Sequence, residues 1–270
     1  MDSRISGFYQ QPVSDRRETI AELADLSEEA IEAIGGTGLD DVRADTISEN
    51  VIGTLEYPLS VATNFKIDGE DTLVPMAVEE TSVVAAASYA ALMARDTGGF
   101  TTDVSGPLMI AQIQAVDVAD PHAAKLRILE EKDRLMDLAD EQDPVLVKFG
   151  GGCEDVEVRV IDTPRDEMVV THLIVNVQDA MGGNAVNTMA EALAPEIEDI
   201  TGGEVELRIL SNLADRRLAR ATCTIPPSNL ADDDSDLTGE EVRDRIVDAW
   251  AFAEADPYRA ATHNKGIMNG

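Results

Sequence analysis

The sequence predicts an α+β protein in which a helix-rich large domain is interrupted by a smaller inserted domain. The chain of 270 residues is long enough for one large or two modest domains. Between residues 107 and 215 the expected elements follow the order β-α-β-β-α-β, the split βαβ or ferredoxin-like plan. The flanking segments 1–106 and 216–270 are rich in helix, and neither is long enough to make a full core alone. We therefore assign both flanks to the large domain.

The first part of the large domain is expected to hold two short helices, a hairpin and an apolar helix. Residues 14–34 are typical of two helical pieces, the second capped by Ser27. Residues 60–76 alternate about Asp68–Gly69, which predicts two paired strands. A helix is expected over residues 79–99, with acidic and hydroxyl residues at its start. Its body is small and apolar on nearly every face, so we expect the helix to be central and buried.

The inserted domain is recognised by alternating stretches separated by helical ones. An amphipathic helix is expected at 123–140, and a second helix at 185–200 contains Pro195, a residue that kinks helices. Behind the domain come an acidic loop at 231–236, a helix at 239–255 and a closing polar loop, 263–270. The four expected strands are 108–118, 156–162, 168–177 and 204–211.

Composition restricts the partners. The net charge of −32 arises from 53 acidic against 21 basic residues, which excludes nucleic acids and anionic membranes as partners. The acids are spread along the chain, which favours a surface adapted to a salt-rich cytoplasm, as in halophiles. Cys153 and Cys223 are expected to be reduced and buried. The start of the chain does not resemble a signal peptide, and the longest apolar run has 12 residues, so we expect a soluble protein.

Two glycine-rich stretches are candidates for ligand contact. The usual Rossmann and P-loop fingerprints are absent. "DAMGGN", starting at Asp179, lies between a strand and a helix, where backbone amides can approach an anion; an ordinary strand-to-helix turn is the alternative. "FGGGC", ending at Cys153, precedes a strand and is better explained by close backbone packing. Asp143, just ahead of it, is either a ribose ligand or a solvated charge.

Charged residues at two places suggest acid–base chemistry. Glu79 and Glu80 lie at the start of the apolar helix, where burial would raise a carboxyl pKa; the alternative is a helix-dipole role. Lys265 is one of only five lysines, and it is either an oxyanion-stabilising cation or a surface lysine. Arg259 has the chemistry to clamp a carboxylate. His263, by contrast, is better explained by packing, and no metal-ligand spacing is present.

Several long stretches, taken together and in order, resemble one family. They are "ENVIGTLEYPLSVATNF", "VPMAVEETSVVAAASY", "GGFTTD", "GGGC", "DAMGGNAVNTMAEALAP", "ITGGEVELRILSNLADRRLARA" and "DPYRAATHNKGIMNG". The family is 3-hydroxy-3-methylglutaryl-coenzyme A (HMG-CoA) reductase of the second, mainly bacterial class. The resemblance implies a two-step, four-electron reduction of HMG-CoA to mevalonate and CoA, or the reverse. It also implies that the inserted domain is a non-Rossmann dinucleotide-binding domain.

The resemblance assigns roles residue by residue. Glu80 takes the place of the catalytic glutamate that shuttles protons, and Lys265 that of the lysine that stabilises the oxyanion. The stretch Glu49–Gly53 falls in the CoA and substrate region. The positions that hold the carboxylate and hydroxyl of the substrate are Ser82, Asn212, Arg259 and Asn269. The positions that bind the dinucleotide are Asp143, Asp179, Met181, Gly182 and Asn184. Asp143 favours NAD over NADP, because its charge would repel a 2′-phosphate.

The resemblance also carries expectations about the whole protein. Family members continue past "GIMNG" with a catalytic aspartate and a histidine that protonates the leaving thiolate. We therefore expect this chain to be a C-terminally truncated fragment that is inactive by itself. The alternative is a non-catalytic remnant that still binds the nucleotide or CoA. We further expect a cytoplasmic homodimer or higher oligomer with active sites between subunits.

Overall fold

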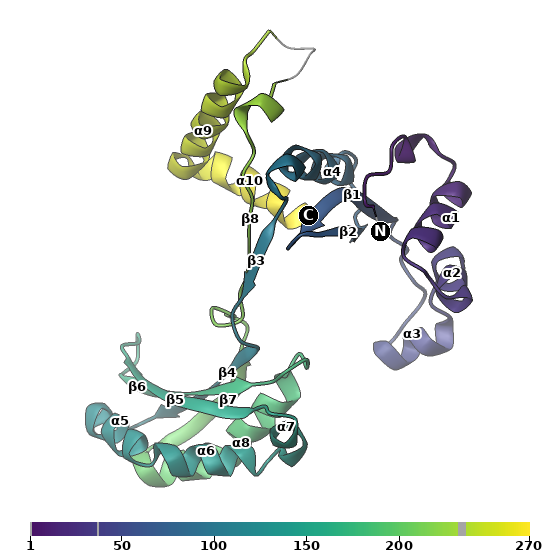
Figure 1. Ribbon diagram of the computed structural model, residues 1–270. Helices are drawn as coiled ribbons and strands as arrows, with labels where there is room; N and C mark the ends of the chain where they lie inside the picture. Colours follow the sequence, from purple (N-terminus) through teal and green to yellow (C-terminus); the bar gives the residue numbers. More distant parts are fainter. Residues whose placement is uncertain (1, 37, 232–235) are drawn as a thin grey trace. The chain divides into compact units, whose positions relative to one another are not determined.

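A computed structural model describes residues 2–36, 38–231 and 236–270 and divides the chain into two compact units (Figure 1). Unit 1 comprises Met1–Thr102 and Ala221–Gly270, and unit 2 comprises Asp103–Arg220. The chain passes from one unit to the other along β3 (Thr101–Val104) and returns along β8 (Ala219–Thr222), which pair with each other. Residues 232–235 of the expected acidic loop lie outside the described residues.

Unit 2 is built on one antiparallel sheet of four strands. They are β4 (Leu108–Val116), β5 (Gly152–Ile161), β6 (Met168–Asn176) and β7 (Glu204–Ser211), in the spatial order β5-β6-β4-β7. All four expected strands are present. Along the chain, helices lie between β4 and β5 and between β6 and β7, which gives the order β-α-β-β-α-β.

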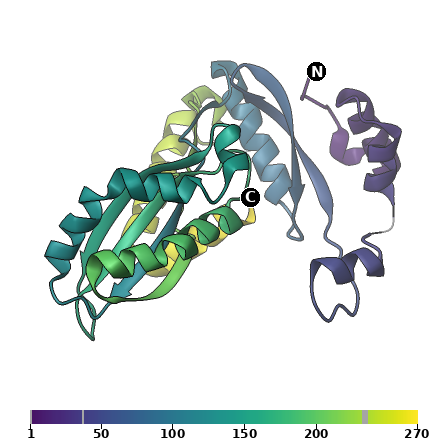
Figure 2. The same cartoon turned by 90° about the horizontal axis from the view of Figure 1, so that it is seen from below.

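Helices cover one face of this sheet (Figures 1 and 2). They are α5 (Pro121–Glu130), α6 (Lys132–Asp140), α7 (Pro144–Lys148) and α8 (Gly183–Thr201). The single helix expected at 123–140 is instead two, because the backbone leaves helical geometry at Glu131. Helix α8 runs on through Pro195. Ile113 and Leu173 of the sheet are fully buried against Met189, Leu193 and Ile197 of α8, which closes a continuous apolar core.

Unit 1 begins with short helices and a hairpin. Helices α1 (Val13–Leu23), α2 (Glu28–Gly35) and α3 (Asp41–Ile47) follow the 3-10 turn η1 (Phe8–Gln10). Ser27 caps α2 as expected, by accepting a bond from the Ala30 N–H. Strands β1 (Leu59–Ile67) and β2 (Glu70–Ala77) pair in an antiparallel hairpin. Its turn is Asp68–Gly69, and both residues have positive φ.

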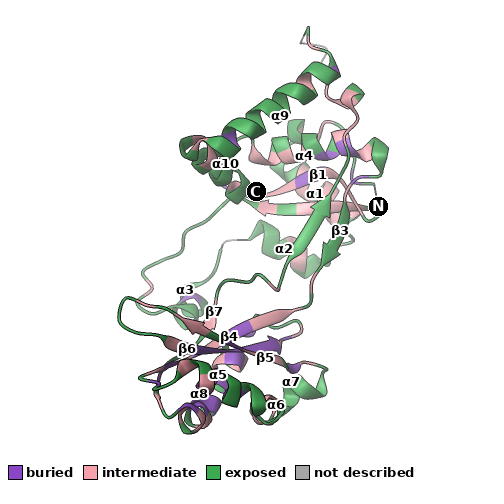
Figure 3. Ribbon diagram, turned by 90° about the vertical axis from the view of Figure 1, so that its left-hand side faces the viewer, coloured by how far each residue is buried: buried purple, intermediate pink, exposed green. Residues whose placement is uncertain are grey.

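The apolar helix α4 (Val83–Ala94) is not buried as expected. Only Ala91 and Ala94 are buried, whereas Tyr89 is 54% exposed and Leu92 46%. The helix packs on β1 along one side, and the described residues leave much of its remaining surface open. Figure 3 shows the difference between the units: buried positions gather in the sheet of unit 2, whereas exposed ones dominate unit 1. The all-apolar sequence of α4 thus predicted that the helix would be buried, but the described residues cover only part of it.

Two further expectations are wrong. The closing segment is not a loop but helix α10 (Pro257–Asn269), which follows α9 (Gly239–Ala255) and packs against it. Asp256 caps α10 and Pro257 opens it, and these start signals outweigh the weak helix propensity of Asn264 and Gly266. Only one of the two thiols is buried: Cys153 is enclosed, and Cys223 is exposed.

None of the helices in the described ranges is both long and apolar enough to cross a bilayer.

Candidate active site

Unit 1 brings Glu80, Lys265 and Asn269 together. Glu80 lies in the segment between β2 and α4, and the other two lie one helical turn apart on α10. The Lys265 ammonium donates to Oε2 of Glu80, and Asn269 Nδ2 donates to the same oxygen at 2.6 Å. The helical form of the closing segment is what places both donors on one face. These residues are 185 and 189 positions from Glu80 in the sequence, so only tertiary folding creates the cluster.

The electrostatics of this cluster differ from the sequence-based expectation. Hydrogen bonds from Lys265 and then from Asn269 lower the pKa of Glu80. Burial was expected to raise it, but the Glu80 side chain is 49% exposed and has a cation beside it. Glu80 is therefore a carboxylate at neutral pH, able to accept a proton. Lys265, 60% exposed, supplies a fixed positive charge within reach of a ligand oxygen.

The other expected substrate residues of unit 1 lie near or beside this cluster. Ser82, two residues after Glu80, starts α4 with a left-handed backbone (φ 74) and makes no side-chain cap bond there. Its hydroxyl is thus not committed to its own helix. Arg259 lies in the first turn of α10, where its backbone N–H donates to Asp256 at 2.8 Å. Its half-buried side chain lies six residues before Lys265, on a different side of the helix.

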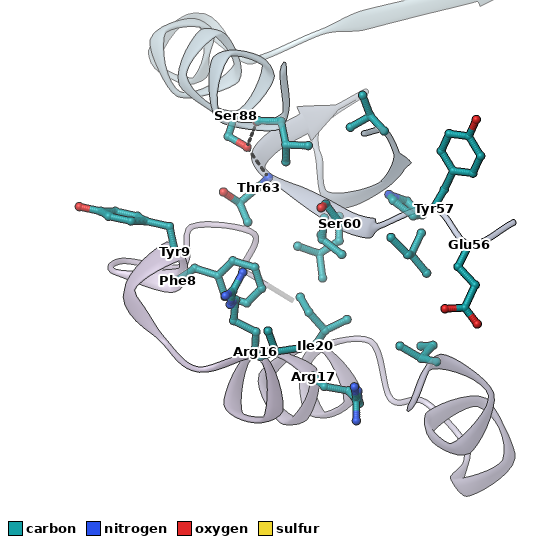
Figure 4. Close-up of a pocket in the computed structure, with 18 of the residues that line it drawn as sticks. Phe8, Tyr9, Arg16, Arg17, Ile20, Glu56, Tyr57, Ser60, Thr63 and Ser88 are labelled. Atoms are coloured by element: carbon teal, nitrogen blue, oxygen red, sulfur yellow. Dashed lines mark hydrogen bonds between the residues drawn. The ribbon is translucent and has the colours of Figure 1, made fainter. Parts of the chain in front are cut away.

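A large hollow of about 1870 Å³ opens beside Glu80 and Ser82, both of which line it. Figure 4 shows its walls: Phe8, Arg16 and Ile20 from the N-terminal segment face Ser60 and Thr63 from β1. Ser88 of α4 accepts a bond from the Thr63 N–H at 3.0 Å and so fixes that wall. The lining is mainly apolar, and it includes the side chains of Arg4, Arg16 and Arg17. Such a mixture suits a long ligand with apolar and anionic parts.

In unit 2, "DAMGGN" forms the turn from β6 into α8, as expected. Gly182 is the N-cap residue with φ 94, and a Cβ there would approach Val177 to 2.6 Å, so the turn requires glycine. No side chain caps α8, and its first turn carries no acidic residue. By contrast, Asp120 and Asp143 cap α5 and α7 of the same unit. The first amides of α8 therefore have no side-chain cap, which leaves their hydrogen bonds for an anionic group such as a dinucleotide pyrophosphate.

Asp143 lies before the glycine stretch and caps α7 by accepting from the Leu146 N–H at 2.9 Å. The glycines behind it pack as expected: a Cβ on Gly151 would approach the Asn176 carbonyl oxygen to 2.5 Å. The cap bond holds the Asp143 carboxylate at the start of α7. One carboxylate oxygen is used by the cap, and the other is available to a ribose hydroxyl.

A second hollow, of about 530 Å³, lies within unit 2. Asp179 and Met181 of the turn line it together with Asn212, so an expected substrate residue adjoins the expected dinucleotide turn. Arg217 also lines it and donates to the Ala180 carbonyl at 3.1 Å. Sequence reasoning missed Arg217. The available signal was three arginines within five residues, at 216, 217 and 220, in a chain poor in basic residues.

Within the described ranges no group of His, Cys, Asp and Glu side chains could hold a metal ion.

Comparisons with known proteins agree on one relationship. The profile of the family described as hydroxymethylglutaryl-coenzyme A reductase matches residues 12–270. The chain is 57% identical over 270 residues to 3-hydroxy-3-methylglutaryl-coenzyme A reductase of Archaeoglobus fulgidus, covering 100% of this chain and 60% of that protein. It superposes with a TM-score of 0.93 and 40% identity on the reductase of Streptococcus pneumoniae, covering 98% of this chain and 62% of the other.

A further solved structure is the class II reductase of Streptococcus pneumoniae bound to NADPH in open conformations. It superposes with a TM-score of 0.92 at 39% identity, covering 98% of this chain and 71% of the other. The chain thus spans about 60% of the length of the Archaeoglobus relative.

Proposed function

This chain belongs to the hydroxymethylglutaryl-coenzyme A reductase family, and on that premise we propose that it supplies catalytic and binding residues for the reductase reaction of the second class. In that reaction one HMG-CoA, two NAD(P)H and two protons give mevalonate, free CoA and two NAD(P)⁺, or the reverse. The observation that carries the proposal is the cluster of Glu80, Lys265 and Asn269 at one carboxylate oxygen.

The cluster has the parts that carbonyl reduction needs. As negative charge develops on the substrate's carbonyl oxygen, the Lys265 ammonium stabilises it. Glu80 exchanges the proton that this oxygen gains in one direction of the reaction and loses in the other. Asn269 orients the Glu80 carboxylate by donating to it. The nicotinamide, when bound, supplies one hydride in each of the two reductive steps.

We place the substrate in the large hollow of unit 1. Glu80 and Ser82 line it, and so do Val51 and Gly53 of the stretch Glu49–Gly53. Arg16 and Arg17 also line it, and their charge complements the phosphates of CoA in an otherwise acidic chain. Arg259 of unit 1 is a further proposed ligand of the substrate's carboxylate and hydroxyl groups. Asn212, which lines the smaller hollow of unit 2, keeps the same proposed role by resemblance alone.

We place the dinucleotide on unit 2. The uncapped start of α8 suits a pyrophosphate, with Asp179, Met181, Gly182 and Asn184 around it. Asp143 would accept a hydrogen bond from the adenosine ribose, and its charge opposes a 2′-phosphate, so we propose NAD as the preferred cofactor. NADP is the alternative, since a similar structure holds NADPH.

The setting of the enzyme completes the proposal. The 53 acidic residues and net charge of −32 support a protein adapted to high salt, where repulsion between surface charges is screened. We propose a cytoplasmic homodimer or higher oligomer, in keeping with the many exposed apolar side chains of unit 1.

The test is HMG-CoA-dependent oxidation of NADH and of NADPH by the native protein, at low and high salt. Lys265→Ala should lower turnover by about 10²- to 10³-fold, because the oxyanion loses its charged donor. Lys66→Ala, which removes a lysine of β1 in the same unit, is the matched control and should stay near the native rate. Saturable NADH binding without any turnover would favour the nucleotide-binding remnant instead, and near-normal turnover of Lys265→Ala would refute the assignment of the lysine.

A further inference from the structure

One side chain in unit 2, that of Gln178, joins two segments that the sequence keeps far apart. It lies directly before Asp179, two residues after the last residue of β6. Its Nε2 donates to the Gly150 carbonyl at 3.0 Å and to Oδ1 of Asn176 at 2.9 Å. The glycine stretch is 28 residues away in the sequence. Gln178 therefore fastens the glycine stretch to the turn that leads into α8.

The two groups that accept from Gln178, the Gly150 carbonyl and the Asn176 carboxamide, are each held by further hydrogen bonds. On one side, Asp143 caps α7, and the N–H groups of Gly150 and Gly151 donate to the Val147 and Leu146 carbonyls at 3.0 Å. On the other side, the Asn176 carboxamide accepts from the Gln178 backbone N–H at 3.1 Å and donates to Glu154 at 2.7 Å. Gly150 and Asp143 are thus joined to the two ends of the same short helix, so a shift of Gly150 would also shift Asp143.

The backbone at Gln178 indicates that the side chain matters at this place. Its φ is 53°, in the left-handed region that glycine and asparagine adopt more readily than glutamine. Glycine would relieve that conformation, and asparagine would tolerate it. Neither reaches Gly150 while bonding Asn176, so the longer carboxamide is what the cross-link requires.

We propose that Gln178 is a positioning residue that sets the spacing between the ribose site at Asp143 and the pyrophosphate site at 179–182. The inference rests on the proposed function, in that it takes a dinucleotide as the ligand of unit 2. A ligand that touches both sites gains affinity when they are held at the right distance. A ligand that touches only one site does not.

The experiment measures dissociation constants of the full chain for NADH and for adenosine, which lacks phosphates. Gln178→Asn and Gln178→Gly are compared with Gln142→Asn, whose Nε2 makes only a local bond, to Leu138 at 3.0 Å. Both Gln178 variants should bind NADH roughly tenfold more weakly, since one spacing constraint is lost. Their adenosine affinity should stay within about twofold of the native value, and Gln142→Asn should match the native chain for both ligands. Amide hydrogen exchange at Gly150 and Gly151 should quicken in the Gln178 variants without ligand.

The possible outcomes separate the two proposals. Unchanged NADH affinity in both Gln178 variants overturns the positioning role and leaves the dinucleotide site standing. Equal weakening of NADH and adenosine, with a lower unfolding midpoint, overturns it in favour of a purely structural role. A native chain that binds neither NADH nor NADPH overturns the dinucleotide site itself and the inference with it. Selective loss of NADH affinity supports both.

Discussion

The two units of this chain close their interiors to different degrees. Unit 2 buries side chains from its sheet and helices in one continuous core, and the largest of them, such as Ile113 and Leu193, have no exposure at all. In unit 1, Trp250 and Phe252 of α9 are 59% and 57% exposed. The proposed cofactor half is thus preorganised by its own packing. The proposed catalytic half presents apolar surface that would be buried only by further contacts.

That difference bears on how the site works. Burial of apolar area is the main source of stability, at roughly 25 cal/mol per Å². The continuous core of unit 2 therefore stabilises the elements on both sides of its glycine turn, β6 and α8. Unit 1 holds the Glu80–Lys265 pair at a half-exposed place, so exclusion of water there would need an additional surface. Exposed faces of this kind mark association in soluble proteins.

The two cysteines provide the sharpest test of the comparison, since each unit carries one. Burial, followed by the charge of Asp140, raises the pKa of Cys153 to about 12 from an ordinary 9.0. Its thiolate fraction at neutral pH is therefore lower by roughly a thousandfold, and enclosure slows labelling further. We expect a thiol reagent at pH 8 to label Cys223 rapidly and Cys153 only on unfolding. Mass spectrometry of the labelled peptides distinguishes the two sites.

Cys223→Ser is the control, and it should leave a chain with almost no fast-reacting thiol. Rapid labelling of Cys153 in that variant would mean that the core of unit 2 opens readily, which would remove the contrast between the units.

Local patterns predicted unit 2 better than unit 1, for physical reasons. Alternation in β4 to β7 and helical spacing in α8 work there because each element buries one face inside the same unit. The all-apolar pattern of α4 gave a wrong prediction of burial. Burial depends on what covers a helix, and the described chain covers only part of α4. The closing segment was wrongly predicted to be a loop, because Gly266 and Asn264 favour one. Asp256 and Pro257 instead start a helix there.

The candidate site shows the same limit. The resemblance paired Glu80 with Lys265 as catalytic residues and gave Asn269 a substrate role, but no local pattern indicated that two donors would meet on one carboxylate oxygen. Nor did any sequence signal single out Gln178, because its role depends on a carbonyl 28 residues away. Contacts over such separations require the fold itself.

A matched pair of isoleucines tests the packing difference directly. Ile197 of α8 is fully buried in unit 2, and Ile246 of α9 is 53% exposed in unit 1. Ile197→Ala should lower the free energy of unfolding of unit 2 by about 2–5 kcal/mol, through lost burial and a cavity. Ile246→Ala should change that of unit 1 by about 0.5 kcal/mol or less. Denaturant unfolding followed by probes in each unit measures both.

The same experiment, repeated over a range of protein concentrations, can contradict the conclusion that unit 1 is less well buried than unit 2. A large cost of Ile246→Ala that grows with concentration would show that α9 is covered by another molecule in solution. The apolar surface of unit 1 would then be buried by association with that molecule.

The smallest effect concerns a polar cluster of unit 1 formed by Ser3, Asp71 and Arg95. Ser3 is fully buried, and its hydroxyl donates to Asp71 at 2.7 Å, while Arg95 donates to the same carboxylate oxygen at 2.7 Å. These bonds lower the pKa of Asp71 from an ordinary 3.8 to about 2, with Ser3 the larger cause. A lowered carboxyl pKa contributes stability that is complete above the unfolded value.

That contribution should disappear as the pH falls from about 4 to about 2, where the folded state also becomes protonated. We expect Asp71→Asn to lower the stability of unit 1 modestly at pH 7 and to flatten its loss of stability over this acid range. Unit 2 should keep its own pH profile, because the cluster lies wholly in unit 1. Unfolding curves from pH 2 to 7 for both proteins supply the measurement. Parallel profiles for the native chain and Asp71→Asn would show that the N-terminal segment is not held by this carboxylate. Unit 1 would then be more open still than its described contacts indicate.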